Sequence, residues 1–128
     1  MNEILITKPL ANKAYDLEER TFVFAKEISA LSREILHKTL ENNEYLKQLI
    51  RSSGSVAANY IEANEAFGKK DFQYRIKICR KEAKESRLWL KLLHIGSNNE
   101  YLLNKQQKLI QEAVELVKIF SAILVKTK

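Results

Sequence analysis

The fold is decided by residues 48–93, which run QLIRSSGSVAANYIEANEAFGKKDFQYRIKICRKEAKESRLWLKLL. Two long segments with helical spacing of apolar residues meet near Gly68, a residue type typical of helix ends. Between Ser52 and Gly68 there is no Lys or Arg, whereas the segment that follows holds most of the chain's excess of basic side chains. The stretch therefore predicts two long helices joined by a short turn, the first largely covered and the second basic on one face.

The composition of the whole chain extends this prediction to an all-α fold. A chain of 128 residues is the size of one domain and can bury a core without disulfides or metal. Three Gly and one Pro are few, and period-two runs typical of strands are missing apart from Ile4-Leu5-Ile6. We expect an N-terminal tail over residues 1–15 and a helical bundle over residues 16–128.

Four helices of this bundle follow from apolar spacing and capping residues. We expect them to run from about residue 16 to 40, from 42 to 67, from 71 to 94 and from 104 to 126. The expected N-caps are Asp16, Asn42 or Asn43, Asp71 and Asn104. Short connections favour antiparallel neighbours, so the prediction is an up-down-up-down antiparallel four-helix bundle.

The second of these helices carries an unusual face of small, uncharged residues behind its core stripe. A surface helix is ordinarily charged there, and small residues let another helix approach closely. We therefore predict that this helix is covered on both sides and that the chain self-associates. The alternative is a tightly packed monomer in which this helix is simply central. The residues assigned to the oligomer interface on this helix are Ser52, Ser55, Asn59 and Ala63.

The third helix adds a second part to the predicted oligomer interface. Trp and apolar residues beside isolated acids are more typical of a subunit contact than of open surface. The residues assigned to it are Ile78, Trp89 and Leu92.

A basic stripe on the third helix is the main functional signal. Its cations fall within an arc of roughly 120° at 100° per residue, away from the expected core seam. Acids four residues away that would neutralise the stripe are sparse, although a solvated charged face is the plainer interpretation. We expect contacts to nucleic-acid phosphates rather than to bases. The stripe consists of Lys77, Arg80, Lys81, Lys84, Arg87 and Lys91.

Enzymatic and metal chemistry are not predicted. Cys79 lies in an apolar stripe, where burial raises the pKa of a thiol instead of activating it. The bundle di-iron motif Glu-x-x-His occurs only once, at Glu34–His37, and the second histidine, His94, has Lys91 in place of the Glu. We expect no catalytic residue, no metal and no cofactor. A single cysteine and the lack of a long apolar run predict a cytoplasmic protein without a membrane segment.

Four segments together resemble a known family. They are QLIRSSGSVAANYIEANEAFGKKDF (48–72), KEAKESRLWLKLL (81–93), DLEERTFVFAKEI (16–28) and EAVELVKIFSAIL (112–124). The chain resembles the four-helix-bundle proteins of intervening sequences in bacterial 23S ribosomal RNA genes, over residues 16–126. Gly54 and Tyr60 depart mildly from the pattern.

This resemblance implies an up-down-up-down bundle that assembles as a homopentamer. It also links the chain to accessory proteins of diversity-generating retroelements, which partner a reverse transcriptase and nucleic acid through a basic surface. No catalytic residue carries over from the family. We therefore expect a non-enzymatic homo-oligomer that binds structured RNA or DNA through its basic face. The alternative is an adaptor or scaffold, for example for a reverse transcriptase, whose basic face has no role in binding nucleic acid.

Overall fold

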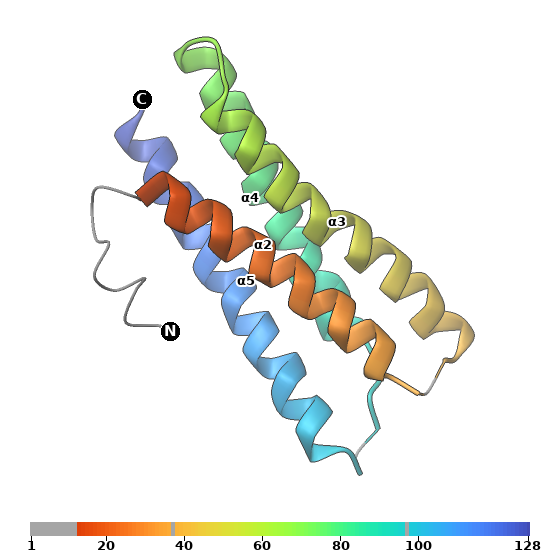
Figure 1. Cartoon of the computed structure of the whole chain (residues 1–128). Helices are drawn as coiled ribbons and strands as arrows, with labels where there is room; N and C mark the ends of the chain where they lie inside the picture. The colour runs from red at the N-terminus through yellow and green to blue at the C-terminus, as the bar shows by residue number, and fades with distance from the viewer. Residues whose placement is uncertain (1–12, 37, 97) are drawn as a thin grey trace.

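The computed structural model describes residues 13–36, 38–96 and 98–128, with side chains from Asp16 onward. It contains four helices, α2 (Lys13–Glu34), α3 (Leu40–Asn64), α4 (Lys69–Leu92) and α5 (Glu100–Lys126). Consecutive helices run antiparallel and lie side by side, and α2 and α5 close the bundle (Figure 1). No strand occurs in these residues. The predicted all-α four-helix bundle is confirmed.

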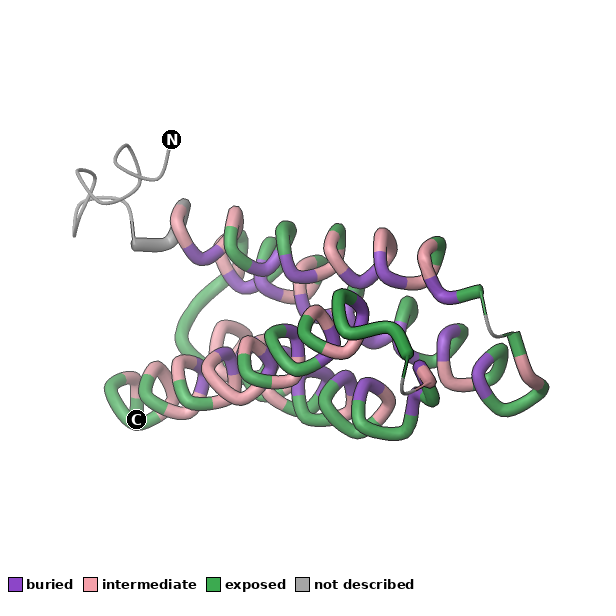
Figure 2. Tube along the Cα trace, turned by 90° about the horizontal axis from the view of Figure 1, so that it is seen from below, coloured by how far each residue is buried: buried purple, intermediate pink, exposed green. Residues whose placement is uncertain are grey.

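The core is one apolar cluster that receives side chains from all four helices. Buried residues follow the inward side of each helix (Figure 2). The largest side chains with almost no exposed surface are Phe24, Ile28, Leu31, Ile35, Leu49, Ile76, Leu90, Leu116 and Phe120. Burying one such side chain contributes about 1.5–3 kcal/mol, so the cluster dominates the stability of the chain.

The predicted helix starts were wrong at every N-cap. Helix α2 begins at Lys13, three residues before Asp16, so the start of the bundle lies inside the predicted tail; residues 1–12 are outside the described part of the chain. Thr39 caps α3 and accepts a hydrogen bond from the backbone N–H of Asn42 at 3.1 Å. Asn99 caps α5 in the same way through Leu102 N–H, also at 3.1 Å. Thr39 and Asn99 lie three to five residues upstream of the predicted caps.

Helix α4 begins with a different type of N-cap from those of α3 and α5. Its N-cap is Gly68, at φ 101°, a backbone conformation that residues with a Cβ rarely adopt. Asp71 lies in the first turn of the helix instead of at its cap, and its carboxylate accepts from Phe67 N–H at 3.2 Å. The carboxylate thus closes the turn between α3 and α4 and complements the helix dipole.

The C-terminal end of α4 is held by two buried polar side chains. Asn42, on α3, donates from Nδ2 to the His94 carbonyl at 2.7 Å and accepts from His94 N–H at 2.9 Å. Gln106, on α5, donates to the carbonyls of Leu90 and Leu93 at 2.8 and 3.1 Å. The last carbonyls of a helix lack intrahelical partners, and here the side-chain amide of Gln106 supplies the hydrogen-bond donor. The helix ends at Leu92, two residues before the predicted His94.

The seam between α2 and α5 is the most open of the bundle. A groove of about 850 Å³ lies along it, with Phe24 and Leu109 among its lining residues. Charged side chains cross the groove: Arg20 forms a forked ion pair with Glu112 at 2.7 and 2.9 Å, and Lys105 reaches Glu34 at 3.0 Å. Exposed ion pairs contribute at most about 1 kcal/mol each, so α2 is held mainly by its contact with α3.

Among the described residues, no helix combines the length and apolar character needed to cross a lipid bilayer.

Candidate nucleic-acid interface

The basic stripe lies on the outward surface of α4. Lys77, Lys81, Lys84, Arg87 and Lys91 are exposed, and Arg80 is half-buried. The opposite side of the same helix carries the buried residues Ile76, Cys79, Ala83 and Leu90. From Lys77 to Lys91 is 14 residues, or about 21 Å of helix at 1.5 Å per residue. The structure therefore presents the six side chains as a single row on a rigid element.

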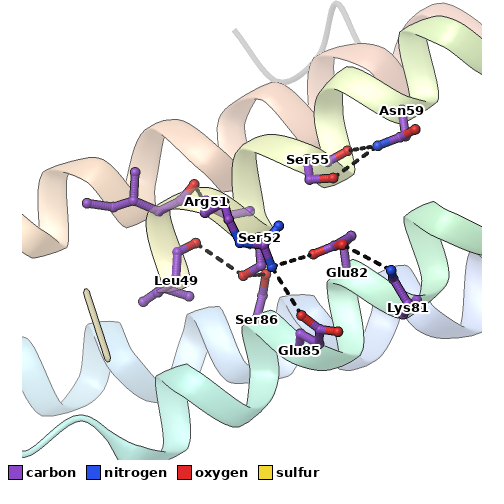
Figure 3. A network of polar contacts seen from close by, with 11 residues as sticks. Leu49, Arg51, Ser52, Ser55, Asn59, Lys81, Glu82, Glu85 and Ser86 are labelled. Carbon is purple, nitrogen blue, oxygen red and sulfur yellow. Dashed lines mark hydrogen bonds and ion pairs between the residues drawn. The ribbon is translucent and has the colours of Figure 1, made fainter. Parts of the chain in front are cut away.

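The acids of α4 are turned toward α3 and leave most of the stripe unneutralised. Arg51 of α3 lies 3.3 Å from the carboxylate of Glu82 and 3.2 Å from that of Glu85 (Figure 3). Glu82 is 5% exposed, and its second oxygen lies 3.5 Å from Lys81 Nζ. Of the stripe residues, only Lys81 has an acidic partner within 4 Å among the residues that the structure describes. Arg51 therefore pairs with both acids across the seam between α3 and α4.

Helix α5 lies beside the stripe, and this neighbour was not predicted from the sequence. Arg80 donates from Nη1 to Ser121 Oγ at 3.4 Å, so the edge of the stripe meets α5. At 100° per residue, Gln107, Gln111 and Lys118 fall within about 80° of Ser121, and all three are exposed. The signal was present in the sequence as uncharged or basic residues at positions 107, 111, 118 and 121, with helical spacing.

Two residues of the predicted oligomer interface are corrected to core positions. Ser52 has no exposed surface and Ala63 is 2% exposed, because both pack inside the chain. The Ser52 hydroxyl shares a hydrogen bond of 2.8 Å with Ser86 of α4. The small residues thus allow α3 and α4 of the same chain to approach closely, and a side chain already buried has no surface to give to a second copy. For these two positions the central-helix alternative holds.

The other two interface residues on α3 are half-buried beside α4. Asn59 donates to Ser55 through its backbone oxygen and its hydroxyl, both at 3.0 Å, and accepts from Arg75 Nη1 at 2.9 Å. These contacts orient Asn59 across the α3–α4 seam. A role for Ser55 and Asn59 in self-association stays a prediction.

The interface residues predicted on α4 lie at the surface. Ile78 and Trp89 are half-buried, and Leu92 is 43% exposed. The Trp89 ring stacks on Tyr45 of α3, with 6.1 Å between centroids and an interplanar angle of 27°. Part of the Trp89 ring is therefore used within the chain, and Ile78 and Leu92 keep the surface that a contact with a second copy would need.

The uncharged exposed strip of α3 consists of residues other than those predicted. Ile50, Gly54, Ala58 and Ile61 face solvent, and Ala57 is half-buried beside them. A Cβ added at Gly54 would meet no atom within 4 Å, so nothing inside the described chain requires glycine there. The sequence indicated a lightly charged outer face on this helix; the exposed uncharged strip lies on these residues, whereas the predicted Ser55 and Asn59 are half-buried.

The residues weighed for catalytic or metal chemistry include Cys79 and His37. Burial raises the pKa of the Cys79 thiol from 9.0 to about 12, and the thiol donates weakly to the Val56 carbonyl at 3.5 Å. The described residues contain no group of three or more His, Cys, Asp or Glu side chains placed to hold a metal ion. His37, the histidine of the single Glu-x-x-His motif, lies outside the described residues.

Comparisons with known proteins agree with this bundle. The family model of the 23S rRNA-intervening sequence proteins matches residues 13–122. The fold is similar to the crystal structure, at 1.70 Å, of a protein with unknown function from the S23 ribosomal protein family of Bacteroides thetaiotaomicron. That likeness has a TM-score of 0.69 and 27% identity, and covers 84% of this chain and 96% of the other. A comparison with curated proteins found no match.

Proposed function

The chain belongs to the 23S rRNA-intervening sequence protein family, and we propose that it is a non-enzymatic homo-oligomer that binds structured RNA or DNA. Binding runs through phosphate contacts from the stripe on α4, formed by Lys77, Arg80, Lys81, Lys84, Arg87 and Lys91. The observation that carries the proposal is the exposed row of cations whose neighbouring acids are engaged by Arg51. The proposed location is the cytoplasm.

The physical basis of binding is the release of counterions from a polyanion. Each Lys or Arg that neutralises a phosphate frees condensed cations, so affinity is high at low salt and falls steeply as salt rises. No base-reading element is required, because phosphate contacts position a protein on nucleic acid without specifying sequence. In the proposed homopentamer the stripe is repeated on each subunit, which raises avidity through multivalency.

A second candidate function is a protein-binding adaptor, for example for a reverse transcriptase. The observation in its favour is a set of exposed apolar side chains on α4, with Tyr74 (59% exposed) and Leu92 (43%) beside the stripe and Leu88 (49%) within its sector. Exposed apolar rows rimmed by polar residues are typical of protein contacts. In this case the basic stripe would keep the oligomer soluble and would not select a ligand.

A salt titration with charge-reversal variants separates the two functions. The test variant changes Lys77, Lys84, Arg87 and Lys91 to Glu, because all four are exposed. The control variant changes Lys26, Arg33, Lys47 and Lys108 to Glu, which are exposed on the other helices. Both variants have the same net charge, so a difference between them reports position on the surface and not total charge.

The expected result is a log–log slope of about −5 for the unmodified protein on a labelled duplex, as six phosphate contacts require. The test variant loses nearly all of this binding, while the control variant retains most of it. Equal losses in both variants would mean that net charge alone attracts the nucleic acid. Binding too weak to measure in the unmodified protein would support the adaptor.

A further inference from the structure

We infer that the nucleic acid bound by this face is a double helix and that α5 binds it together with α4. This inference rests on the proposed function and adds the class of ligand and three binding residues. The added residues are Gln107, Gln111 and Lys118.

The length and rigidity of the stripe fit a duplex. A double helix carries one phosphate per about 1.7 Å of axis, so about 21 Å of it holds about 12 phosphates, roughly half of them on the side that faces the protein. That number matches the six cations between Lys77 and Lys91. The phosphates of a duplex are already fixed in space, whereas a single strand would lose conformational freedom to follow a straight row.

The chemistry of the stripe lacks what single-strand binding uses. Proteins that hold single strands stack the bases on aromatic side chains. Among the described residues, the sector of α4 that holds the stripe contains no aromatic ring, and its one large apolar residue is the aliphatic Leu88. Tyr74 lies about 90° from the centre of the stripe, and the guanidinium of Arg75 is 5.8 Å from its ring centroid. The face therefore offers charge without a stacking platform.

Helix α5 supplies a second row of donors parallel to the first. The Arg80–Ser121 hydrogen bond of 3.4 Å places the two helices edge to edge at the stripe. Axes of packed helices lie about 8–10 Å apart, so the donors of both helices form one continuous surface. Glu115 accepts from Gln111 at 2.9 Å and lies 3.7 Å from Lys118, so it orients both side chains along the exposed face of α5.

The test compares nucleic acids of one sequence in different forms. Labelled 20-nucleotide RNA is measured as a single strand and as a duplex, with a DNA duplex of the same sequence as a third probe, by fluorescence anisotropy at fixed salt. A Gln107→Glu/Lys118→Glu variant removes the contribution of α5. A Lys47→Glu/Gln48→Glu variant, at exposed positions of α3, makes the same chemical change away from the site.

The expected result is at least tenfold tighter binding of duplex than of single strand. The α5 variant weakens duplex binding at least fivefold and lowers the salt slope by about 1, and the α3 variant has little effect. Similar affinity for both duplexes means that phosphate rows are recognised, and a preference for the RNA duplex adds contacts to the 2′-hydroxyls.

Two results would each overturn one part of the inference and leave the other part intact. Equal or tighter binding of the single strand, still dependent on α4, would refute the duplex assignment and leave the proposed function intact. Duplex binding that ignores the α5 variant would remove α5 from the site. Failure to bind any of the three probes would refute the proposed function itself.

Discussion

Cys79 shows how burial of one group makes the stability of the bundle depend on pH. Burial raises the pKa of its thiol from 9.0 to about 12 in the folded chain. The folded pKa is the higher one, so the stabilisation is fully present below about pH 9 and is lost as pH rises toward 12. As pH rises from about 9 to 12, the thiol ionises in the unfolded chain before it does in the folded chain, and this favours the unfolded chain.

We therefore expect the unmodified protein to lose stability relative to Cys79→Ala above pH 9. The unmodified protein should lose up to about 1.4 kcal/mol per pH unit relative to the variant, which progressively offsets the constant cost of the small cavity in the variant. Urea unfolding of both proteins at pH 8, 9 and 10 measures it. A difference that stays the same at all three pH values would show that the thiol does not titrate as described.

The hydrogen bonds of Asn42 allow a second prediction, of a change in the free energy of unfolding. Replacing it with Ala removes both hydrogen bonds to the His94 backbone. We expect the free energy of unfolding to fall by about 1–3 kcal/mol, since each of the two hydrogen bonds contributes about 0.5–1.5 kcal/mol net. Chemical denaturation measures the change, and Asn43→Ala at the exposed neighbouring position serves as the control. Equal effects at both positions would contradict a specific role for Asn42.

Individual residues mark where sequence-based prediction succeeded and failed. The buried position of Cys79 could be predicted, because it lies in an apolar stripe with helical spacing. The role of Asn42 could not be predicted, because an Asn side chain is equally suited to cap a helix and to form buried hydrogen bonds to a distant backbone. Its actual partner, His94, lies 52 residues away and is brought near only by the fold.

At the scale of the helix, Gly54 is a weak point of α3 that the chain itself does not explain. An added Cβ would meet nothing within 4 Å, and a glycine in a helix interior costs up to about 1 kcal/mol relative to alanine. We expect Gly54→Ala to raise the free energy of unfolding by about 0.5–1 kcal/mol, measured by denaturation at low protein concentration. A lower stability, or a loss of self-association in the variant, would mean that another copy of the chain packs against this position.

The helices themselves were predictable because apolar spacing repeats over more than twenty residues in each. Their ends were not, since Thr39 and Asn99 compete with several equally suitable caps nearby. Ser52 was assigned to a subunit contact for a related reason, although it packs inside the chain. Ser52 and Asn59 are small and uncharged, so they fit a subunit contact and a close helix pair within the chain equally well. The surface position of the basic stripe was easier to predict, because six cations have no stable place in an apolar core.

Across the whole molecule, charge is divided between the two halves. Residues 13–65 hold seven basic and nine acidic side chains, whereas residues 66–128 hold fourteen basic and six acidic ones. Copies of the chain would repel one another through α4 and α5 and much less through α2 and α3. Exposed Phe22, Ile50 and Ile61 lie on that less charged side.

We expect the protein to self-associate in solution, because these apolar side chains gain from being covered. Sedimentation or light scattering at tens of micromolar should give a multiple of the 14.9 kDa chain, and a homopentamer would weigh about 75 kDa. The measurement should be made in moderate salt, so that repulsion between basic faces is screened. A clean 14.9 kDa species would refute self-association.

The groove between α2 and α5 determines the order in which the bundle comes apart. Helix α2 has a full packing partner only in α3, while its other side is bridged by ion pairs of small net value. Local opening follows the least densely packed unit, so α2 detaches before α3 and α4 separate. We expect its backbone amides to exchange with deuterium first, and those beside Cys79 on α4 to exchange only when the whole chain unfolds.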